Sequence, residues 1–314
     1  MVATLTQENV VETRRLAETM RTLRQAFSMF KNAKSITGLS IIGVFVILAI
    51  FAPLIARFDP HEQDWTALRQ APNARHWLGT THLGEDIFSQ LAYGTRSVLI
   101  VGFSTAFIAV AISVVIGVSS GYITGWKSEL LSAITNVFLV IPGLPLIMAI
   151  TAHLENPGLM VVSGVLAFTG WAWGARVLRA LTMSLKNRDF IQAAKANGEP
   201  LWRIISVEML PNLIAIIASS FVATVTAAVL GLTTLAFIGI IPVTTLNWGT
   251  ILFFAQSAGA FPDMWWWYVP AGVAIALLGT ALSLINFGID EYVNPRLRSS
   301  GERSRAQRKK NRAH

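Results

Sequence analysis

The order of apolar and polar positions divides the chain into six long apolar runs separated by polar segments. The runs cover residues 36–55, 98–122, 130–152, 159–178, 213–241 and 266–289. Each is close to or longer than the ~20 helical residues that cross ~30 Å of hydrocarbon. The pattern therefore predicts an all-α, polytopic membrane protein with six transmembrane helices.

Composition agrees with a membrane protein. Of the 314 residues, 53% are hydrophobic and 13% are charged, whereas soluble domains carry about 25% charged residues. The net charge of +8 does not indicate a nucleic-acid partner, because Lys and Arg gather at the two chain ends and in one internal segment between apolar runs. The chain contains no cysteine, which excludes disulfides, thiolate metal sites and a cysteine nucleophile.

The distribution of Lys and Arg predicts the orientation in the membrane. These residues are concentrated before the first run, between the fourth and fifth runs, and after the sixth run. If there are six spans, all three segments lie on one side, which the positive-inside rule identifies as the cytoplasm. We therefore expect both termini to be cytoplasmic and residues 57–96 to form an extracytoplasmic loop.

Several segments lie outside the six-span domain, which is expected to cover residues 36–298. Residues 1–35 repeat apolar side chains at spacings of four and three, with arginines between them. This indicates a cytoplasmic amphipathic helix, and a loosely attached basic tail is the alternative. Residues 299–314 are basic and are expected to be disordered. Residues 248–260 are too short to span and are interpreted as an interfacial or re-entrant helix.

The predicted spans contain few ionisable side chains. Ion channels and proton-coupled carriers usually have such groups within their spans, so the sequence does not favour these classes. No two of the five histidines have the helical spacing of a metal-binding pair, so no metal site is expected. Asn136 in the third run and Thr224 and Thr226 in the fifth are candidates for lining a pathway. Ordinary hydrogen bonding between helices is the alternative role for the threonines.

The polar segment between the fourth and fifth runs, residues 185–212, predicts a helix–turn–helix. A short helix is expected to break at Gly198, and a second helix with Pro200 in its first turn to reach the next span at Pro211. Alanines in the first helix would let the surface of another protein approach its backbone closely. Such a segment could transmit a movement into the spans on both sides.

This segment resembles the cytoplasmic loop of the membrane subunits of bacterial ABC importers, which carries Glu-Ala-Ala, three residues, Gly, and a later Leu-Pro. The matching residues are Gln192, Ala193, Ala194, Gly198, Leu210 and Pro211. Gln192 replaces the usual Glu, so its ionic contact is lost while the packing is kept. The lead-in of Asp189 and Phe190, together with residues 202–205, resembles the dipeptide, oligopeptide and nickel branch of these importers.

A second match lies in the loop of residues 57–96. The second permease subunit of the same branch carries Gly-Thr-Asp, Leu-Gly-Arg-Asp and Ser-Arg in this loop. The matching residues are Gly79, Thr80, Leu83, Gly84, Asp86 and Ser89. Thr81, Glu85 and Gln90 depart from the pattern at its Asp and two Arg positions. The loop could take part in handing over a ligand or could only pack on the outer mouth.

The resemblance implies a multi-pass permease subunit of the bacterial inner membrane that couples to its ATPase through residues 189–211. No Gly-x-x-x-x-Gly-Lys-Ser/Thr phosphate loop occurs in the chain, so ATP and Mg²⁺ are expected in a separate ATPase chain. The implied partners are a second homologous permease subunit, two ATP-binding subunits and an extracytoplasmic solute-binding protein. No catalytic residue is expected in this chain.

Short peptides are the substrate that the resemblance favours. Oligosaccharide or nickel import is the alternative within the same family. From another class, an ion-coupled secondary transporter is the main alternative, and a membrane-embedded scaffold or enzyme subunit is a third. Secondary transporters often have internal inverted repeats and intramembrane charges, and neither feature is recognised in this sequence.

Overall fold

A computed structural model describes residues 32–151, 153, 158–241 and 245–293. The expected tail of residues 299–314 and nearly all of the expected amphipathic segment, residues 1–31, lie outside this part of the chain. Within the described ranges every regular element is a helix, apart from one isolated bridge between Thr80 and Asp86. The predicted all-α class is confirmed.

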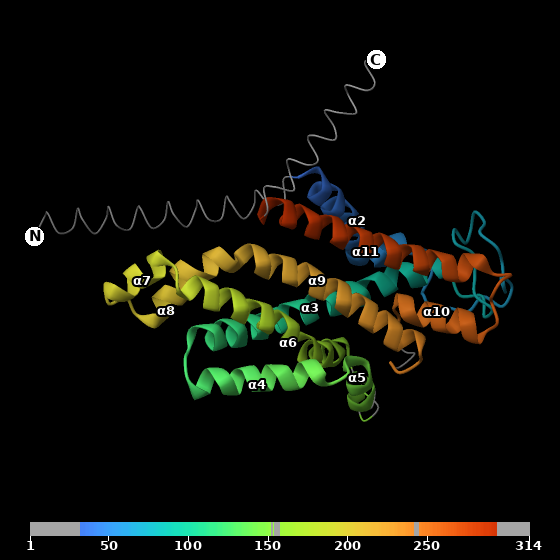
Figure 1. Ribbon diagram of the computed structural model, residues 1–314. Helices are drawn as coiled ribbons and strands as arrows, with labels where there is room; N and C mark the ends of the chain where they lie inside the picture. The colour runs from blue at the N-terminus through green and yellow to red at the C-terminus, as the bar shows by residue number, and fades with distance from the viewer. Residues whose placement is uncertain (1–31, 152, 154–157, 242–244, 294–314) are drawn as a thin grey trace, which may run out of the picture.

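The helices follow one another in chain order in Figure 1. They are α2 (Ala33–Ile55), α3 (Ile87–Tyr122), α4 (Trp126–Val140), α5 (Gly143–Thr151), α6 (Leu159–Lys186), α7 (Asp189–Ala196), α8 (Leu201–Arg203), the π-helix η2 (Ile204–Met209), α9 (Leu210–Phe237), α10 (Trp248–Ser257) and α11 (Trp265–Val293). Five helical stretches are long and apolar enough to cross a membrane, and the bent pair α4 and α5 makes up to six.

The third predicted span, residues 130–152, contains Pro142 and Pro145, which predict an irregular helix. The helices α4 and α5 meet at an 86° bend. Pro142 lies in this break and has no backbone N–H, and a proline disfavours helical geometry in the residue before it. Ile141 accordingly has an extended backbone with ψ of 125°. The irregularity is therefore a break between two helices.

The second span is longer than predicted. We expected it to begin near Val98, whereas α3 begins at Ile87 and runs for 36 residues. At about 1.5 Å per residue it is about 54 Å long, well beyond the ~30 Å hydrocarbon thickness. Its first turns therefore project from the apolar belt toward the loop of residues 57–86.

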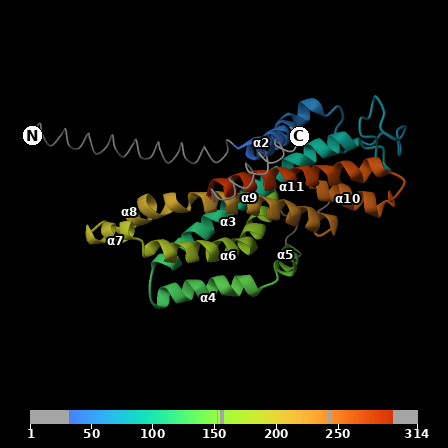
Figure 2. The same cartoon turned by 45° about the horizontal axis from the view of Figure 1, so that its top comes forward.

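The long helices lie roughly along one axis, with different helices meeting at the two ends (Figures 1 and 2). The helix α3 packs most extensively on α6 and also contacts α9, while α2 lies beside α11. The helices α7 and α8 extend from one end of the bundle, called here the α7 end. The loop of residues 57–86 and α10 lie at the opposite end, called here the loop end.

Small residues bring α3 and α6 close together. Gly117 and Gly121 are four residues apart on α3, and a Cβ atom at Gly117 would lie 2.6 Å from the carbonyl oxygen of Ala175. Membrane helices commonly use this small-xxx-small spacing to pack backbone against backbone. About one turn before Gly117 on α3, the Ser113 hydroxyl donates to the carbonyl of Trp171 on α6 at 2.6 Å. The pair is thus fixed by van der Waals contact and by hydrogen bonds.

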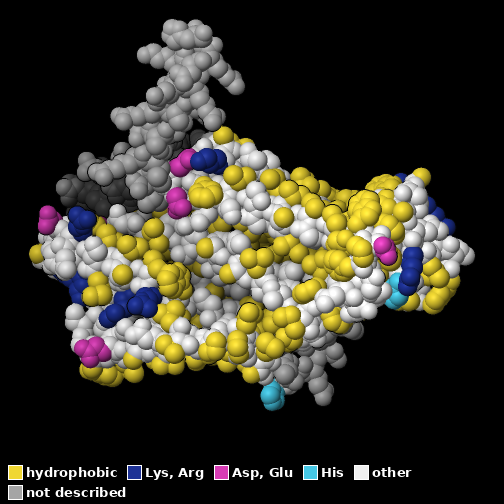
Figure 3. Space-filling model, turned by 45° about the vertical axis from the view of Figure 1, so that its right-hand side comes forward, with side chains coloured by type: hydrophobic (Ala, Val, Ile, Leu, Met, Phe, Trp, Pro, Cys, Tyr) yellow, Lys and Arg dark blue, Asp and Glu magenta, His cyan; other side chains and the backbone are white. Residues whose placement is uncertain are grey.

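The surface in Figure 3 carries Lys, Arg, Asp and Glu toward the two ends of the visible face, with apolar side chains prominent in the belt between them. Large apolar side chains on α2 are exposed in this subunit, including Val44 at 64% and Leu54 at 81%. A continuous apolar surface of this extent is energetically unfavourable in water. This belt is therefore the part of the protein that contacts lipid or another membrane subunit.

Candidate functional site

The first candidate site is α7, whose C-terminus closes as a Schellman motif. The amide of Gly198 donates to the carbonyl of Lys195 at 3.0 Å, and the amide of Glu199 donates to the carbonyl of Ala194 at 3.1 Å. Gly198 has φ of +73°, a conformation that costs other residues about 1–2 kcal/mol. The predicted break at Gly198 is therefore present, and its cause is backbone geometry.

Three buried apolar side chains hold the hairpin on the bundle. Ile191 from α7 is fully buried, and it packs with Ile204 and Met209 from the following helical segment. Leu185 and Tyr122, at the ends of α6 and α3, complete the cluster. These anchors were not singled out in the sequence, where they resemble any other apolar position of a helix.

The hairpin also exposes three large apolar side chains, here called together the α7 face. It is formed by Phe190, Leu201 and Trp202, which are 42%, 51% and 69% exposed. Asp189, Gln192 and Ala193 are also exposed on α7, and the Gln192 side chain donates to the Lys186 carbonyl at 2.9 Å. An Arg203–Glu199 ion pair of 2.8 Å holds the start of the second helix.

The second helix of the hairpin runs directly into the fifth span. We expected it to meet the span at Pro211, but α8, η2 and α9 form one stretch from Leu201 to Phe237. Pro211 has no N–H to donate to the turn before it, and the backbone accommodates this through the six-residue π-helix Ile204–Met209. Leu210 and Pro211 are half-buried where α9 begins. The hairpin is therefore mechanically continuous with the span.

The three candidate pathway residues lie on two separate helices. Asn136 is exposed on α4, in the last turns before the break at Pro142. Thr224 and Thr226 on α9 are half-buried, and each hydroxyl donates to the carbonyl four residues earlier in the same helix, at 2.7 and 3.1 Å. A pathway role for these residues remains a prediction.

The second candidate site is the loop of residues 57–86, whose tight packing depends on two glycines. Gly79 and Gly84 have φ of +74° and +82°. A Cβ atom at Gly84 would lie 2.0 Å from the carbonyl oxygen of Asp64, which is backbone and cannot move cheaply. The Thr66 hydroxyl, followed by the Thr66 amide, hydrogen-bonds the Asp64 carboxylate and lowers its pKa below the ordinary value. The loop therefore closes on itself by direct backbone contact.

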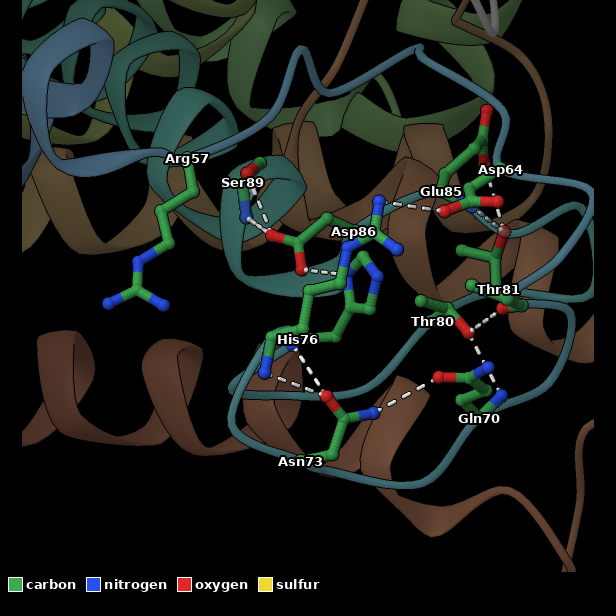
Figure 4. Close-up of polar contacts among 12 residues, drawn as sticks. Arg57, Asp64, Gln70, Asn73, His76, Thr80, Thr81, Glu85, Asp86 and Ser89 are labelled. Carbon is green, nitrogen blue, oxygen red and sulfur yellow. Dashed lines mark hydrogen bonds and ion pairs between the residues drawn. The ribbon is translucent and has the colours of Figure 1, made fainter.

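Buried polar side chains at the centre of the loop form hydrogen bonds with one another, as Figure 4 shows, while Nε2 of His76 is buried without a partner. Asp86 caps α3 by accepting from the amide and the hydroxyl of Ser89 at 2.8 and 2.7 Å. Its other oxygen lies 2.9 Å from Nδ1 of His76, and both side chains are at most 3% exposed. The Thr80 hydroxyl donates to the carbonyl of Ala67 at 2.5 Å. Thr80 and Asp86 therefore fix the fold of this loop.

The three positions that depart from the family pattern lie together. The Glu85 carboxylate accepts from the Thr81 hydroxyl at 3.2 Å and from the Gln90 amide at 3.0 Å. Leu83 is half-buried beside them, and with Glu85 and Gln90 it lines a cavity at the loop end. The sequence marked these positions as exceptions, but their proximity depends on the folded loop.

Metal chemistry finds no support in the described part of the chain. No three His, Asp or Glu side chains within it are grouped so that they could hold a metal ion. The side chains of His76 and Asp86 lie 2.9 Å apart, and the loop buries both of them.

Comparisons with known proteins agree with this architecture. Residues 113–299 match the family described as binding-protein-dependent transport system inner membrane component. Residues 23–72 match the N-terminal transmembrane domain of oligopeptide transport permease C. The two family matches together cover residues 23–72 and 113–299.

Curated relatives and a solved structure extend the comparison. An oligopeptide transport system permease protein of Mycobacterium bovis is 32% identical over 86% of this chain and 92% of its own. A dipeptide transport system permease protein of Alkalihalophilus pseudofirmus is 33% identical over 88% of this chain and 90% of its own. A structure of the MetNI methionine ABC transporter in inward-facing conformations matches with a TM-score of 0.52 and 21% identity, over 65% of this chain and 94% of that one.

Proposed function

The chain belongs to the family of binding-protein-dependent transport system inner membrane components, and from this membership we propose that it forms half of the translocation pathway for short peptides. It is a multi-pass membrane permease subunit of a bacterial ABC importer. Such importers combine permease, ATP-binding and solute-binding proteins. The specific assembly proposed here has a second homologous permease, two ATP-binding subunits and one extracytoplasmic solute-binding protein.

The exposed α7 face is the observation that carries the coupling proposal. Phe190, Leu201 and Trp202 expose large apolar side chains on a hairpin that is anchored by buried residues on its other side. Exposed aromatic residues over a rigid support are typical of energetic centres in protein interfaces. We infer that this face docks on an ATP-binding subunit, where ATP and Mg²⁺ are bound.

Orientation follows from the same assignment. If the α7 end faces an ATP-binding subunit, it is cytoplasmic, and the loop end lies outside the membrane. This agrees with the concentration of Lys and Arg in the segment that contains α7. Both termini are then on the cytoplasmic side, as the charge distribution predicts.

The hairpin can pass a movement to the pathway because of its continuity with α9. Closure of the ATP-binding subunits would displace α7, and the unbroken stretch from Leu201 to Phe237 would carry that displacement through the membrane. A partner shifts the conformational equilibrium only by binding one state more tightly than another. ATP therefore acts by changing how well the docked surfaces fit the inward-open and outward-open states.

The break between α4 and α5 supports a pathway on that side of the subunit. Irregular backbone at membrane depth is tolerated where it is covered by protein or lines a water-filled cavity. The exposed Asn136 lies in the last turns of α4 before the break at Pro142. We propose that this region faces the second permease subunit and the substrate pathway, with Thr224 and Thr226 on α9 contributing small polar groups.

Short peptides are the proposed substrates because the similar permeases from Mycobacterium bovis and Alkalihalophilus pseudofirmus are named for oligopeptide and dipeptide transport. Transport assays of the reconstituted importer with peptides, oligosaccharides and nickel distinguish the alternatives within the family. Uptake that depends on an ion gradient and not on ATP would instead indicate a secondary transporter.

A substitution at Gly198 tests the coupling proposal. Gly198→Val places a β-branched side chain at φ of +73°, so the turn between α7 and α8 must change. In the reconstituted importer we expect at least a tenfold loss of peptide uptake per ATP hydrolysed. Gly125→Val is the matched control, since Gly125 has φ of +78° and open space in the α3–α4 turn. Equal coupling in both variants would contradict docking through α7.

A further inference from the structure

A cavity of about 430 Å³ opens at the loop end, between the loop of residues 57–86, the start of α3, α10 and α11. It is large enough for an amino-acid side chain with its backbone. Polar residues line one part and apolar residues the rest. The lining residues are His61, His82, Leu83, Glu85, Gln90, Leu246, Ile251, Phe254 and Trp267.

Glu85 gives this cavity a negative charge. Its hydrogen-bond donors, the side chains of Thr81 and Gln90, are both neutral. Among the ion pairs of the described residues none involves Glu85, and neither Lys nor Arg lines the cavity. A half-buried carboxylate without a cationic neighbour attracts a cation more strongly than one in open solvent, because screening is weaker.

Aromatic rings and unpartnered nitrogen atoms lie in the same cavity. Trp267 is only 1% exposed and stacks on His82, with ring centroids 5.3 Å apart. Nε1 of Trp267 and Nδ1 of His82 are both buried without a hydrogen-bond partner. Buried polar atoms normally have partners, so these two indicate a site that a bound molecule or water completes. Phe254, which is 37% exposed, has a ring over which a cation can be placed.

The hydrogen bonds of Thr81 and Gln90 to Glu85 place these three residues in one cluster. Within this cluster Glu85 carries the charge, because the side chains of Thr81 and Gln90 are neutral.

We propose that this cavity is an outer binding site for a primary ammonium group on an apolar stem. Glu85 pairs with the ammonium group, while Leu246, Ile251 and Phe254 contact the apolar stem. This inference rests on the proposed peptide transport, since the free N-terminus of a peptide that begins with an apolar residue has this chemistry. It assigns to the loop end a preference for unblocked peptide N-termini.

A single cysteine tests the charge of the cavity directly. The chain has no native cysteine, so Leu246→Cys creates one unique thiol in this subunit. In the full importer in lipid nanodiscs at pH 8, where an ordinary histidine is neutral, cationic and anionic methanethiosulfonate reagents are compared. We expect the cationic reagent to react about tenfold faster relative to its rate on free cysteine. Glu85→Gln should bring the ratio near one, and Glu85→Arg should invert it.

Ligand protection tests the recognition itself. Leucinamide carries an ammonium group on an apolar stem and should slow labelling of Leu246→Cys in a saturable manner, whereas N-acetylleucinamide should not. Glu85→Gln should weaken the protection at least tenfold. The control thiol, Ala71→Cys in the loop of residues 57–86, is exposed and does not line the cavity, so leucinamide should not slow its labelling.

These measurements do not require transport, so they separate this inference from the proposed importer function. ATP-driven uptake of peptides with no charge preference and no leucinamide protection would overturn the cavity assignment and leave the importer intact. Protection without ATP-driven uptake would support the site and reject peptide import. Normal melting temperatures of the Glu85 variants guard against loss of folding as the cause of any change.

Discussion

The two ends of the molecule satisfy their surface groups in opposite ways. At the loop end, buried polar side chains such as Thr80, Asp86 and Asn247 find their hydrogen-bond partners within the chain. At the α7 end, Phe190 and Trp202 leave large apolar surface without cover in this subunit. Around Thr80 and Asp86 the loop end thus holds its own fold through internal hydrogen bonds, whereas the α7 end exposes an apolar surface that a partner would complete.

Two glycines with similar backbone geometry, one at each end of the molecule, allow the packing of the two ends to be compared. Gly84 and Gly198 have φ of +82° and +73°. A Cβ atom at Gly84 would clash with the backbone of Asp64, whereas one at Gly198 would meet nothing within 4 Å. The same substitution should therefore have different costs at the two ends.

The largest effect is expected from Gly84→Ala. Backbone strain at positive φ and the clash with Asp64 together should lower the free energy of unfolding by about 3 kcal/mol or more. Gly198→Ala bears the strain alone and should cost about 1–2 kcal/mol. Thermal melting of the purified chain in detergent measures both. Equal losses would mean that the loop is not closed on its own backbone.

A second, smaller effect is expected from Asp86→Ala. The variant removes the N-cap of α3 and leaves buried His76 without its carboxylate, which should cost about 2–3 kcal/mol. Asp86→Asn keeps an oxygen for Ser89 and should lose less. Hydrogen exchange of the first turn of α3 reports the cap locally. If that turn stays as protected in Asp86→Ala as in the parent chain, the capping role is wrong.

The smallest effect on stability is expected at the α7 end. Trp202→Ala removes a side chain that is 69% exposed, so the free energy of unfolding should change by less than about 0.5 kcal/mol. Binding of the ATP-hydrolysing subunit should nevertheless weaken at least about tenfold, as for a central aromatic interface residue. Val207→Ala, also exposed but on η2, is a control near the patch. A Trp202 variant with lower stability and unchanged binding would reverse the contrast between the ends.

Sequence reasoning predicted the spans well because hydropathy reports directly on burial in lipid. It was less successful where helices leave the apolar belt. The segment of α3 before Val98 contains Gln90 and Arg96, so its composition does not indicate a membrane helix. The signal that was present was local: Asp86 is placed to cap a helix, with Ser89 three residues later.

The break in the third span illustrates a signal that was noticed but not fully used. Pro142 and Pro145 indicate an irregular helix, yet sequence alone does not decide between a kink and the observed 86° bend. That choice depends on how α5 packs on α6. The break at Gly198 was easier to predict, because a helix C-terminus has its own local signature.

Long-range polar contacts could not be predicted at all. His76 lies in a predicted loop, and its separation of ten residues from Asp86 does not indicate a contact within one helix or strand. The two side chains meet only because Gly79 and Gly84 fold the intervening chain back. The cluster of Thr81, Glu85 and Gln90 likewise depends on the loop and on the first turn of α3.

The π-helix Ile204–Met209 also has a consequence for residue register. A π-turn holds one residue more than an α-turn, so it absorbs an extra residue without breaking the rod between Leu201 and Phe237. At 3.6 residues per turn, each residue added to or removed from an α-helix rotates everything beyond it by about 100°. This short segment therefore fixes the rotation of Trp202 about the helix axis relative to the side of α9 that packs in the bundle. Inserting or deleting one residue in it would turn the exposed face of the hairpin away from its present direction.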